Sequence, residues 1–445
     1  MNVYQHCPTF ENERWRIRPV QTTDATGLAA VYGDPAALFN GDNCNGEDFH
    51  YATLERTEQA VAFWVEALTQ GYFVRWTLED KRANALAGTI EAFLRTADDA
   101  LNDTVLLRLD VGSTWENEEA LGGILALWLP KARAVFGGKQ TATKVFTGAA
   151  ARRAALTAAG FGAEDHVLVG NDGTAYGGYA VCSLTGFALA EAADLPSAMA
   201  LLSRAPELNL FMLGDLTNYG VSGDKTDLFV LPGASGDAAA LLLRYETYWN
   251  LYCPGEKPEA RVIADFLAGW PMDSFSAERS DMEHLTANVP DFFAGREIEK
   301  TKLCCRRAGS AVENTLPPQT ELRFLTAEEA AQSEALLQGI AEFADHYETP
   351  EDTARSLRIA QENVNKGELL CGLYLEGTLA AVAATTASTA DSAMIVGVAT
   401  REELRGCGYA TAVMSALCAK AFEQGKKSLC LFYDNEAAGR IYRGM

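Results

Sequence analysis

A glycine loop between an apolar strand and an amphipathic helix constrains the fold of this 445-residue chain more than any other feature. The strand is predicted over 394–400, where a short run of mostly apolar, often β-branched residues is bounded by charge. A polar loop over 401–408 follows, and a helix is predicted from Tyr409 to Gly425, with apolar residues at helical spacing. This order is typical of a βαβ unit, in which helices are layered on a sheet.

Two glycines, Gly406 and Gly408, lie where the chain enters the helix. Without a Cβ atom they let the backbone approach a ligand closely, and the first-turn N–H groups point at that ligand with the positive end of the helix dipole. Each anionic charge at an exposed terminus contributes only about 0.3–1 kcal/mol, so several donors must converge. The loop therefore predicts a phosphate or pyrophosphate site, to which Arg405 adds a formal positive charge.

Two further elements follow the helix. A strand is predicted over 428–433, and a second helix starts soon after it, with Asn435 at its beginning and Tyr442 within it. These two residues are about two helical turns apart, so both side chains can face one cleft.

The region resembles the GNAT superfamily of N-acetyltransferases in two motifs. Arg405 to Ala410 is similar to the family's Arg/Gln-x-x-Gly-x-Gly/Ala loop for the pyrophosphate of acetyl-coenzyme A, and Asn435 to Tyr442 is similar to its Asn-x-x-Ala-x-x-x-Tyr motif. The resemblance implies that acetyl-coenzyme A is the co-substrate and that its acetyl group passes to a primary amine, on a small molecule or a peptide, by direct attack.

The resemblance also implies roles for individual residues. Backbone N–H groups near Val398 bind the thioester carbonyl, Asn435 lies on the pantetheine side, and Tyr442 is the general acid for the departing thiolate. A phenol of pKa about 10 is reasonably matched to a thiolate leaving group. The implied cofactor-binding residues are Val398, Ala399, Arg405, Gly406, Cys407, Gly408, Tyr409, Ala410 and Asn435. No general base is assigned, and the candidates are Glu342, Asp345, His346, Glu348 and Glu376.

Two other interpretations stay open. In one, the glycines only close a tight turn in an ordinary βαβ unit and Tyr442 is a core aromatic residue. In the other, the protein is a non-catalytic acyl-coenzyme A-binding or protein-interaction module. A dinucleotide-binding fold is disfavoured because the loop contains no Gly-x-Gly-x-x-Gly sequence.

Composition indicates a globular chain and argues against several partners. At about 100–200 residues per domain, the length predicts two to four domains. No apolar run approaches the ~20 residues of a membrane helix, and the N-terminus has no secretory pattern, so we expect a cytoplasmic protein without a membrane partner. The formal charge of −23 disfavours nucleic acid and fits a cationic amine. The oligomeric state is not predicted.

A metal site is not expected. The ten cysteines are dispersed, except for the neighbours Cys304 and Cys305, and are predicted to be reduced thiols. The five histidines form no His-x-x-x-His pair, and no Cys-x-x-Cys pair occurs.

The order of predicted strands and helices repeats along the chain. Residues 1–183 resemble a degenerate GNAT-like domain and residues 184–310 a degenerate, partial one. Residues 311–445 resemble the N-acetyltransferase domain itself, and the first ten of them, 311–320, form a linker. The predicted fold class is therefore α/β, or α+β in layers, with repeated GNAT-like folds, each a mixed, largely antiparallel sheet flanked by helices.

Two departures from the family pattern lead to specific expectations. In the first copy, three glutamates stand where amides should receive a pyrophosphate, and like-charge repulsion should oppose the cofactor; they are Glu116, Glu118 and Glu119. In the last copy, the sequence stops at Met445, soon after the tyrosine helix. We therefore expect the final sheet pairing and part of the acceptor wall to be unsupplied.

Local signals place other elements near this module. A strand is predicted over 298–304, and a capping box at 326–329 predicts a helix that extends to Phe343. Another helix should start at Thr349. A hairpin is predicted around 376–378.

Overall fold

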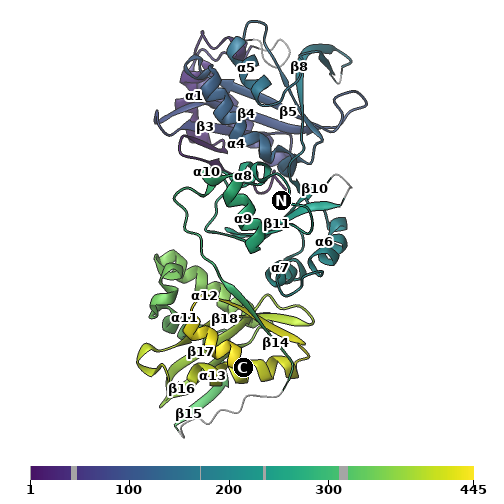
Figure 1. Ribbon diagram of the computed structural model, residues 1–445. Helices are drawn as coiled ribbons and strands as arrows, with labels where there is room; N and C mark the ends of the chain where they lie inside the picture. The colour runs from purple at the N-terminus through teal and green to yellow at the C-terminus, as the bar shows by residue number, and fades with distance from the viewer. Residues whose placement is uncertain (1, 42–47, 171, 234–236, 310–318) are drawn as a thin grey trace. The chain divides into compact units, whose positions relative to one another are not determined.

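The computed structural model describes residues 2–41, 48–170, 172–233, 237–309 and 319–445. These residues divide into two compact units (Figure 1). Unit 1 comprises Met1–Leu195 and Val221–Arg296, and unit 2 comprises Pro196–Gly220 and Glu297–Met445. Most of the predicted linker lies outside the described residues. The predicted domain boundaries at 183 and 310 stay predictions.

The first part of unit 1 is an 8-stranded sheet in the order β1-β2-β3-β4-β5-β6-β8-β7. Among these neighbours only β5 and β6 run parallel. The strands are β1 (Phe10–Glu11), β2 (Trp15–Pro19), β3 (Val74–Asp80), β4 (Ala85–Arg95), β5 (Thr104–Val111), β6 (Gln140–Lys144), β7 (His166–Val169) and β8 (Ala175–Ser183). The flanking helices are η1 (Thr22–Asp24), α1 (Ala25–Tyr32), α2 (Leu38–Gly41), α3 (Leu54–Gln70), η2 (Ser113–Trp115), α4 (Glu118–Phe136) and α5 (Ala150–Ala158).

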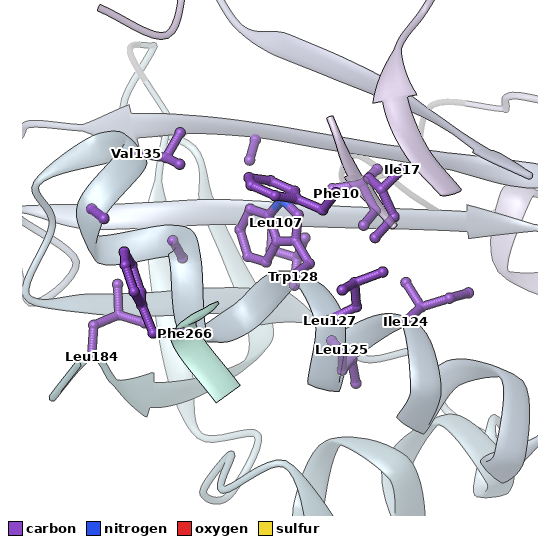
Figure 2. Packing of buried hydrophobic residues seen from close by; sticks show 14 of the residues in the cluster. Phe10, Ile17, Leu107, Ile124, Leu125, Leu127, Trp128, Val135, Leu184 and Phe266 are labelled. Atoms are coloured by element: carbon purple, nitrogen blue, oxygen red, sulfur yellow. The ribbon is translucent and has the colours of Figure 1, made fainter. Parts of the chain in front are cut away.

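The second part of unit 1 is a 5-stranded sheet in the order β13-β12-β11-β10-β9. Its strands are β9 (Ala188–Leu189), β10 (Thr226–Pro232), β11 (Ala238–Tyr245), β12 (Tyr248–Tyr252) and β13 (Ser274–Ala277). The helices of this region are η3 (Ala192–Asp194), α8 (Ala260–Leu267), α9 (Arg279–Asn288) and α10 (Pro290–Phe293), whereas α6 (Leu195–Leu202) lies in unit 2 except for its first residue. One hydrophobic cluster joins both sheets, with Trp128 of α4 and Phe266 of α8 among its members (Figure 2). The two sheets of unit 1 therefore share a core.

Unit 2 is built on a 6-stranded sheet in the order β14-β19-β18-β17-β16-β15. The strands are β14 (Lys302–Arg307), β15 (Thr320–Phe324), β16 (Leu370–Leu375), β17 (Thr378–Thr386), β18 (Ser392–Thr400) and β19 (Ser428–Tyr433). Only β18 and β19 run parallel among these neighbours. The helices are α7 (Leu210–Tyr219), α11 (Ala330–Gln338), η4 (Ala341–Tyr347), α12 (Pro350–Asn365), η5 (Glu402–Leu404), α13 (Tyr409–Glu423) and α14 (Glu436–Gly444). Both units thus have the predicted mixed, largely antiparallel sheets with helices.

The outer edge of β19 is paired with β14, a strand from upstream of the module. The two strands are antiparallel from Lys302 opposite Tyr433 to Arg307 opposite Ser428. The expectation that the final sheet pairing would be unsupplied is therefore wrong. In unit 1 the matching strand β6 is paired with β8, which follows it in the sequence. An upstream strand or a downstream strand can equally satisfy the backbone donors and acceptors along the edge. No local sequence signal indicates which of the two pairs there.

Helices cover both faces of the unit 2 sheet. α13 packs on one face through Val413, Met414 and Leu417. α11 and α12 cover the other face in a cluster with Val382 and Ala399. Side chains alternate between faces along a strand, so these two clusters form two separate layers of core.

Helix α7 packs on the same face of the sheet as α11 and α12. Its Leu210 lies in a cluster with Met394 of β18 and Cys430 of β19. The helix approaches closely because Gly214 has no side chain: a Cβ atom there would lie 2.6 Å from backbone atoms of Ala387. A segment from before the module therefore forms part of its core.

The local predictions hold for the hairpin and for α12, with two corrections elsewhere. Glu376 and Gly377 have φ of 49° and 78°, as a two-residue hairpin turn requires, and Thr349 caps α12. The helix predicted to reach Phe343 ends at Gln338, since Ile340 takes an extended conformation before η4. The strand predicted from Ile298 starts at Lys302, where its pairing with β19 begins.

Candidate active site

The candidate site lies where β18 and β19 separate. The strands pair only over Ser392–Met394 and Ser428–Cys430, although β18 continues to Thr400 and β19 to Tyr433. The C-terminal halves of these two described strands therefore form no ladder with each other. Their facing edges keep backbone groups for a ligand.

A β-bulge in β18 lies inside this region. One residue separates Val382 from Ala384 on β17, whereas two residues, Gly397 and Val398, lie between their partners on β18. Gly397 has a φ of 60°, which favours glycine. A bulge leaves the extra residue outside the regular ladder. The bulge thus occurs where the family resemblance implies that backbone N–H groups bind a thioester carbonyl.

Val398 and Ala399 follow the bulge with side chains on opposite faces. Val398 contacts the cluster around α13, and Ala399 is buried in the cluster around α11. Their apolar side chains belong to the two core layers. Only their backbone atoms are therefore available for polar contacts with a ligand.

The glycine loop has the geometry of an anion site. Gly406 and Gly408 have φ of 80° and 82°. Gly408 is the N-cap of α13 and supplies no side-chain cap to the first-turn amides. Cys407 is exposed, Ala410 is half-buried, and Tyr409 is buried against the sheet. The arrangement combines backbone donors with the positive end of a helix dipole.

The charge of Arg405 is paired within the protein. Its Nη1 and Nη2 donate to the two carboxylate oxygens of Glu342 at 2.9 and 3.0 Å. The hydrogen bond from Arg405 holds the pKa of Glu342 below its usual range. Both side chains are nearly half exposed, at 44% and 46%, and such surface pairs contribute only about 0–1 kcal/mol. A pyrophosphate group with two charges can therefore compete with Glu342 for Arg405.

Asn435 acts as the N-cap of α14. Its Oδ1 accepts hydrogen bonds from the N–H groups of Ala437 at 2.8 Å and Ala438 at 3.4 Å. This cap explains why the helix begins at Glu436. The oxygen is committed to the helix, so a contact of Asn435 with a cofactor would involve its Nδ2 or its backbone.

Tyr442 lies on α14 and is half-buried. Its ring packs edge-on against Tyr433 of β19, with a centroid separation of 5.7 Å. Burial, with a smaller effect of Asp434, raises the pKa of the Tyr442 phenol to about 12. At neutral pH the hydroxyl therefore carries its proton, as a general acid must before it acts. The core-aromatic interpretation is compatible with the same packing.

A cavity of about 510 Å³ opens on the face of the sheet that carries α11 and α12. It reaches Val396 and Gly397 at the bulge, and α7 contributes Phe211 to its wall. Of the candidate bases, His346 lines this cavity. Glu342 is paired with Arg405, Glu376 lies in the hairpin turn, and Asp345 and Glu348 do not line the cavity.

Sequence reasoning missed two residues of this cavity. Glu334 of α11 is buried, with 9% exposure, and lines it. Its signal was a carboxylate one helical turn before Leu337, on the apolar side of an amphipathic helix. Phe211 left no comparable signal, because its position depends on the packing of α7 against β18.

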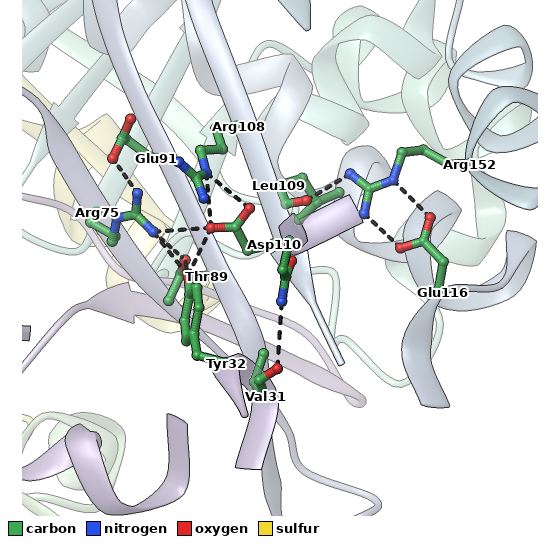
Figure 3. Close-up of polar contacts among 11 residues, drawn as sticks. Val31, Tyr32, Arg75, Thr89, Glu91, Arg108, Leu109, Asp110, Glu116 and Arg152 are labelled. Carbon is green, nitrogen blue, oxygen red and sulfur yellow. Dashed lines mark hydrogen bonds and ion pairs between the residues drawn. The ribbon is translucent and has the colours of Figure 1, made fainter. Parts of the chain in front are cut away.

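In unit 1 the matching strand, turn and helix are β5, η2 and α4, and their loop amides are bound by the chain itself. Asp34 accepts from the N–H of Ser113 at 2.8 Å, and Asn117 accepts from the N–H of Ala120 at 3.0 Å. Glu116 is held by Arg152, with N–O distances of 2.7 and 2.6 Å (Figure 3). Carboxylates therefore stand where a phosphate would bind.

A buried polar network lies beside this loop in unit 1 (Figure 3). The Nη1 of Arg75 donates to Tyr32, Thr89 and Asp110 at 2.9, 3.0 and 3.2 Å. Arg75 also pairs with Glu91. The positive charge of Arg75 is paired with carboxylates inside unit 1 and is not presented to an anionic ligand.

The six-stranded sheet, the separating strands and the glycine loop define a domain with an N-acetyltransferase fold. Residues 336–445 match the model of the acetyltransferase (GNAT) family. This part of the chain is therefore a GNAT-family domain, and it contains all the predicted site residues. Members of this family use acetyl-coenzyme A as co-substrate. No curated protein matches the chain.

Solved structures with similarity to the chain include several acetyltransferases. One is the ribosomal-protein-S5-alanine acetyltransferase from Vibrio fischeri, with 16% identity, a TM-score of 0.30, and coverage of 40% of this chain and 96% of that one. A second is the GCN5-related N-acetyltransferase-like protein from Streptococcus suis, with 14% identity, a TM-score of 0.37, and coverage of 57% and 94%. A third is the tandem GNAT protein from the clavulanic acid biosynthesis pathway, with 14% identity, a TM-score of 0.36, and coverage of 58% and 94%. No activity or residue role transfers from them.

Membrane-spanning helices and metal-binding clusters are both absent from the described part of the chain. No helix there has the length and apolar character needed to cross a membrane. In the same residues, no group of three or more His, Cys, Asp or Glu side chains is arranged to hold a metal ion.

Proposed function

We propose that unit 2 is an acetyl-coenzyme A-dependent N-acetyltransferase that transfers acetyl to a primary amine by direct attack. The observation that carries this proposal is the glycine loop at the N-terminus of α13, next to a bulged strand that has separated from its parallel neighbour. The loop suits a pyrophosphate and the bulge suits a thioester carbonyl, and the two are joined by a short segment of chain.

Cofactor binding, oxyanion stabilisation and thiolate protonation each have a proposed group. The loop amides of residues 405–410 bind pyrophosphate, and Arg405 exchanges Glu342 for the cofactor. Backbone N–H groups near Val398 stabilise the oxyanion of the tetrahedral intermediate. The C–S bond breaks, and Tyr442 protonates the thiolate of coenzyme A.

A second candidate is a non-catalytic acyl-coenzyme A-binding module. The observation that favours it is the packing of Tyr442 against Tyr433, which a purely structural tyrosine would also show. Both candidates require cofactor binding, so binding alone does not separate them.

The deciding experiment has two stages on the full chain. Calorimetric titration with acetyl-coenzyme A should give saturable binding, and a thiol-release assay over a panel of primary amines should give turnover. Binding without release from any amine would favour the second candidate. Absence of binding would overturn both.

A further inference from the structure

The cavity on the α11 and α12 face has the size and lining of a ligand site. Its volume of about 510 Å³ lies in the range of roughly 300–1,000 Å³ that is typical of small-molecule pockets. Most of its wall is apolar and comes from α11, η4, α12, β18, β19 and α7. Representative wall residues are Phe211, Leu337, Phe343, Ile359, Val364 and Phe432.

Two carboxylates interrupt this apolar wall, Glu334 and Glu368. Glu368 accepts hydrogen bonds from Thr385 and Ser388. Glu334 is buried, and its Oε2 accepts a hydrogen bond from the hydroxyl of Tyr347 at 2.7 Å. Within the described residues, no lysine or arginine forms an ion pair with Glu334, and His346 lies near enough to lower its pKa slightly against the effect of burial. Buried carboxylates are normally paired with a positive charge. The Glu334 carboxylate is therefore suited to a cation that enters the cavity.

The cavity is also placed for the reaction. It reaches Gly397 in the bulge of β18 and Val396 just before it. An amine anchored in the cavity would approach the thioester carbonyl from the α11 side of the sheet. Acetyl-coenzyme A would reach the same point from the loop at the start of α13.

We propose that this cavity binds a primary amine carried on an apolar body, such as an arylalkylamine, and that Glu334 binds its ammonium group and takes up its proton. This inference rests on the proposed N-acetyltransferase function. Phe211 and Phe432, whose rings stack with a centroid separation of 6.3 Å, hold the apolar body. The segment that precedes the module thus supplies part of the acceptor wall.

The proton balance is complete without another reactant. The ammonium group gives one proton to the Glu334 carboxylate, and the neutral amine attacks the thioester carbon. The C–N bond forms first and gives the tetrahedral intermediate, and the C–S bond then breaks as the thiolate takes the Tyr442 proton. The second amine proton is lost to solvent, from which the Tyr442 phenolate regains a proton. Glu334 then returns its proton to solvent. Burial raises the pKa of Glu334, which makes its carboxylate a better proton acceptor.

The test uses 2-phenylethylamine and its neutral isostere 2-phenylethanol as probes for the full chain. We expect the amine to bind at least tenfold more tightly than the alcohol by calorimetric titration. Glu334→Gln keeps the shape and the acceptor for Tyr347 but removes the charge. It should weaken amine binding at least tenfold and leave alcohol binding unchanged. Phe432→Ala should weaken both probes.

The control is Glu328→Gln, an exposed carboxylate just before α11, which should change neither probe. Equal binding of the amine by the wild type and Glu334→Gln, or no binding of either probe, would overturn the proposal. Glu334-dependent binding without acetyl transfer would leave this site intact and refute the proposed function. Acetyl transfer to polar amines alone, unaffected by Glu334→Gln, would support the proposed function and refute this amine site.

Discussion

At the residue scale, the glycine loop makes the most direct prediction. Gly408→Glu should weaken acetyl-coenzyme A binding at least tenfold, ~1.4 kcal/mol, because a carboxylate and a strained backbone replace a glycine N-cap. Calorimetric titration measures the change. Gly425→Glu is the matched control, since Gly425 is also exposed with positive φ, of 96°, but lies beyond the other end of α13. Equal loss in both variants would show that strain alone is responsible.

Releasing Arg405 from its ion pair with Glu342 should instead strengthen cofactor binding. Glu342→Gln frees the guanidinium and removes a negative charge near the loop. Since a surface pair contributes about 0–1 kcal/mol, coenzyme A should bind up to about fivefold more tightly at low salt. Arg405→Gln should weaken binding. A titration series in rising salt should reduce both effects, and weaker binding by Glu342→Gln would show that Glu342 supports the site.

Tyr442 separates an enzyme from a binding module. If its hydroxyl protonates the thiolate, Tyr442→Phe should reduce kcat by roughly 10²–10⁴-fold with cofactor affinity unchanged. Steady-state thiol release and calorimetric titration measure these two quantities. Tyr374→Phe is the control, because its hydroxyl bonds Gln332 away from the cavity. A Tyr442→Phe variant with full turnover would leave the tyrosine a packing role only.

At the element scale, two pieces of chain from before the module complete it. β14 pairs the outer edge of β19, and α7 packs on β18 and β19. In unit 1 the edge of β6 is covered by a later strand instead. A sheet edge requires only a partner with unpaired backbone groups, so the same architecture is reached with two different chain orders.

The close packing of α7 can be tested with a single methyl group. Gly214→Ala places a Cβ atom 2.6 Å from Ala387 backbone atoms and should lower stability by about 1–3 kcal/mol. The control is Gly122→Ala in α4, where the added atom meets nothing within 4 Å. That change should stabilise by ~0.5–1 kcal/mol, because alanine favours a helix. Urea denaturation of both variants measures this, and an unchanged Gly214→Ala would mean that α7 does not pack on Ala387.

At the scale of the whole molecule, the copies differ in what occupies their loops. In unit 1 the amides of Ser113 and Ala120 are bound by Asp34 and Asn117. In unit 2 the equivalent N-cap, Gly408, has no side chain. An anionic ligand in unit 1 would have to displace the Asp34 carboxylate, which has a charge of the same sign, and the Asn117 amide oxygen.

We therefore expect acetyl-coenzyme A to bind once per chain. Calorimetric titration of the full chain should give a stoichiometry of one, and Gly408→Glu should weaken that single site. Two equivalent sites in the wild type would contradict the prediction. A second, weaker site that survives in Gly408→Glu would assign binding to unit 1.

Features that depend on a few neighbouring residues can be predicted from the sequence. Gly406 and Gly408 dictate the loop conformation, Asn435 caps α14, and Glu376-Gly377 closes a hairpin. Each of these signals acts through backbone dihedral angles or a cap within one turn, so it can be read locally.

Contacts between residues far apart in the sequence depend on the tertiary packing. Arg405 and Glu342 are 63 positions apart, and Cys305 and Cys430, which face each other across β14 and β19, are 125 apart. Phe211 and Glu334 meet in one cavity for the same reason. Such contacts form only when whole elements pack, and their free energy comes from buried surface and paired edges that no local pattern encodes.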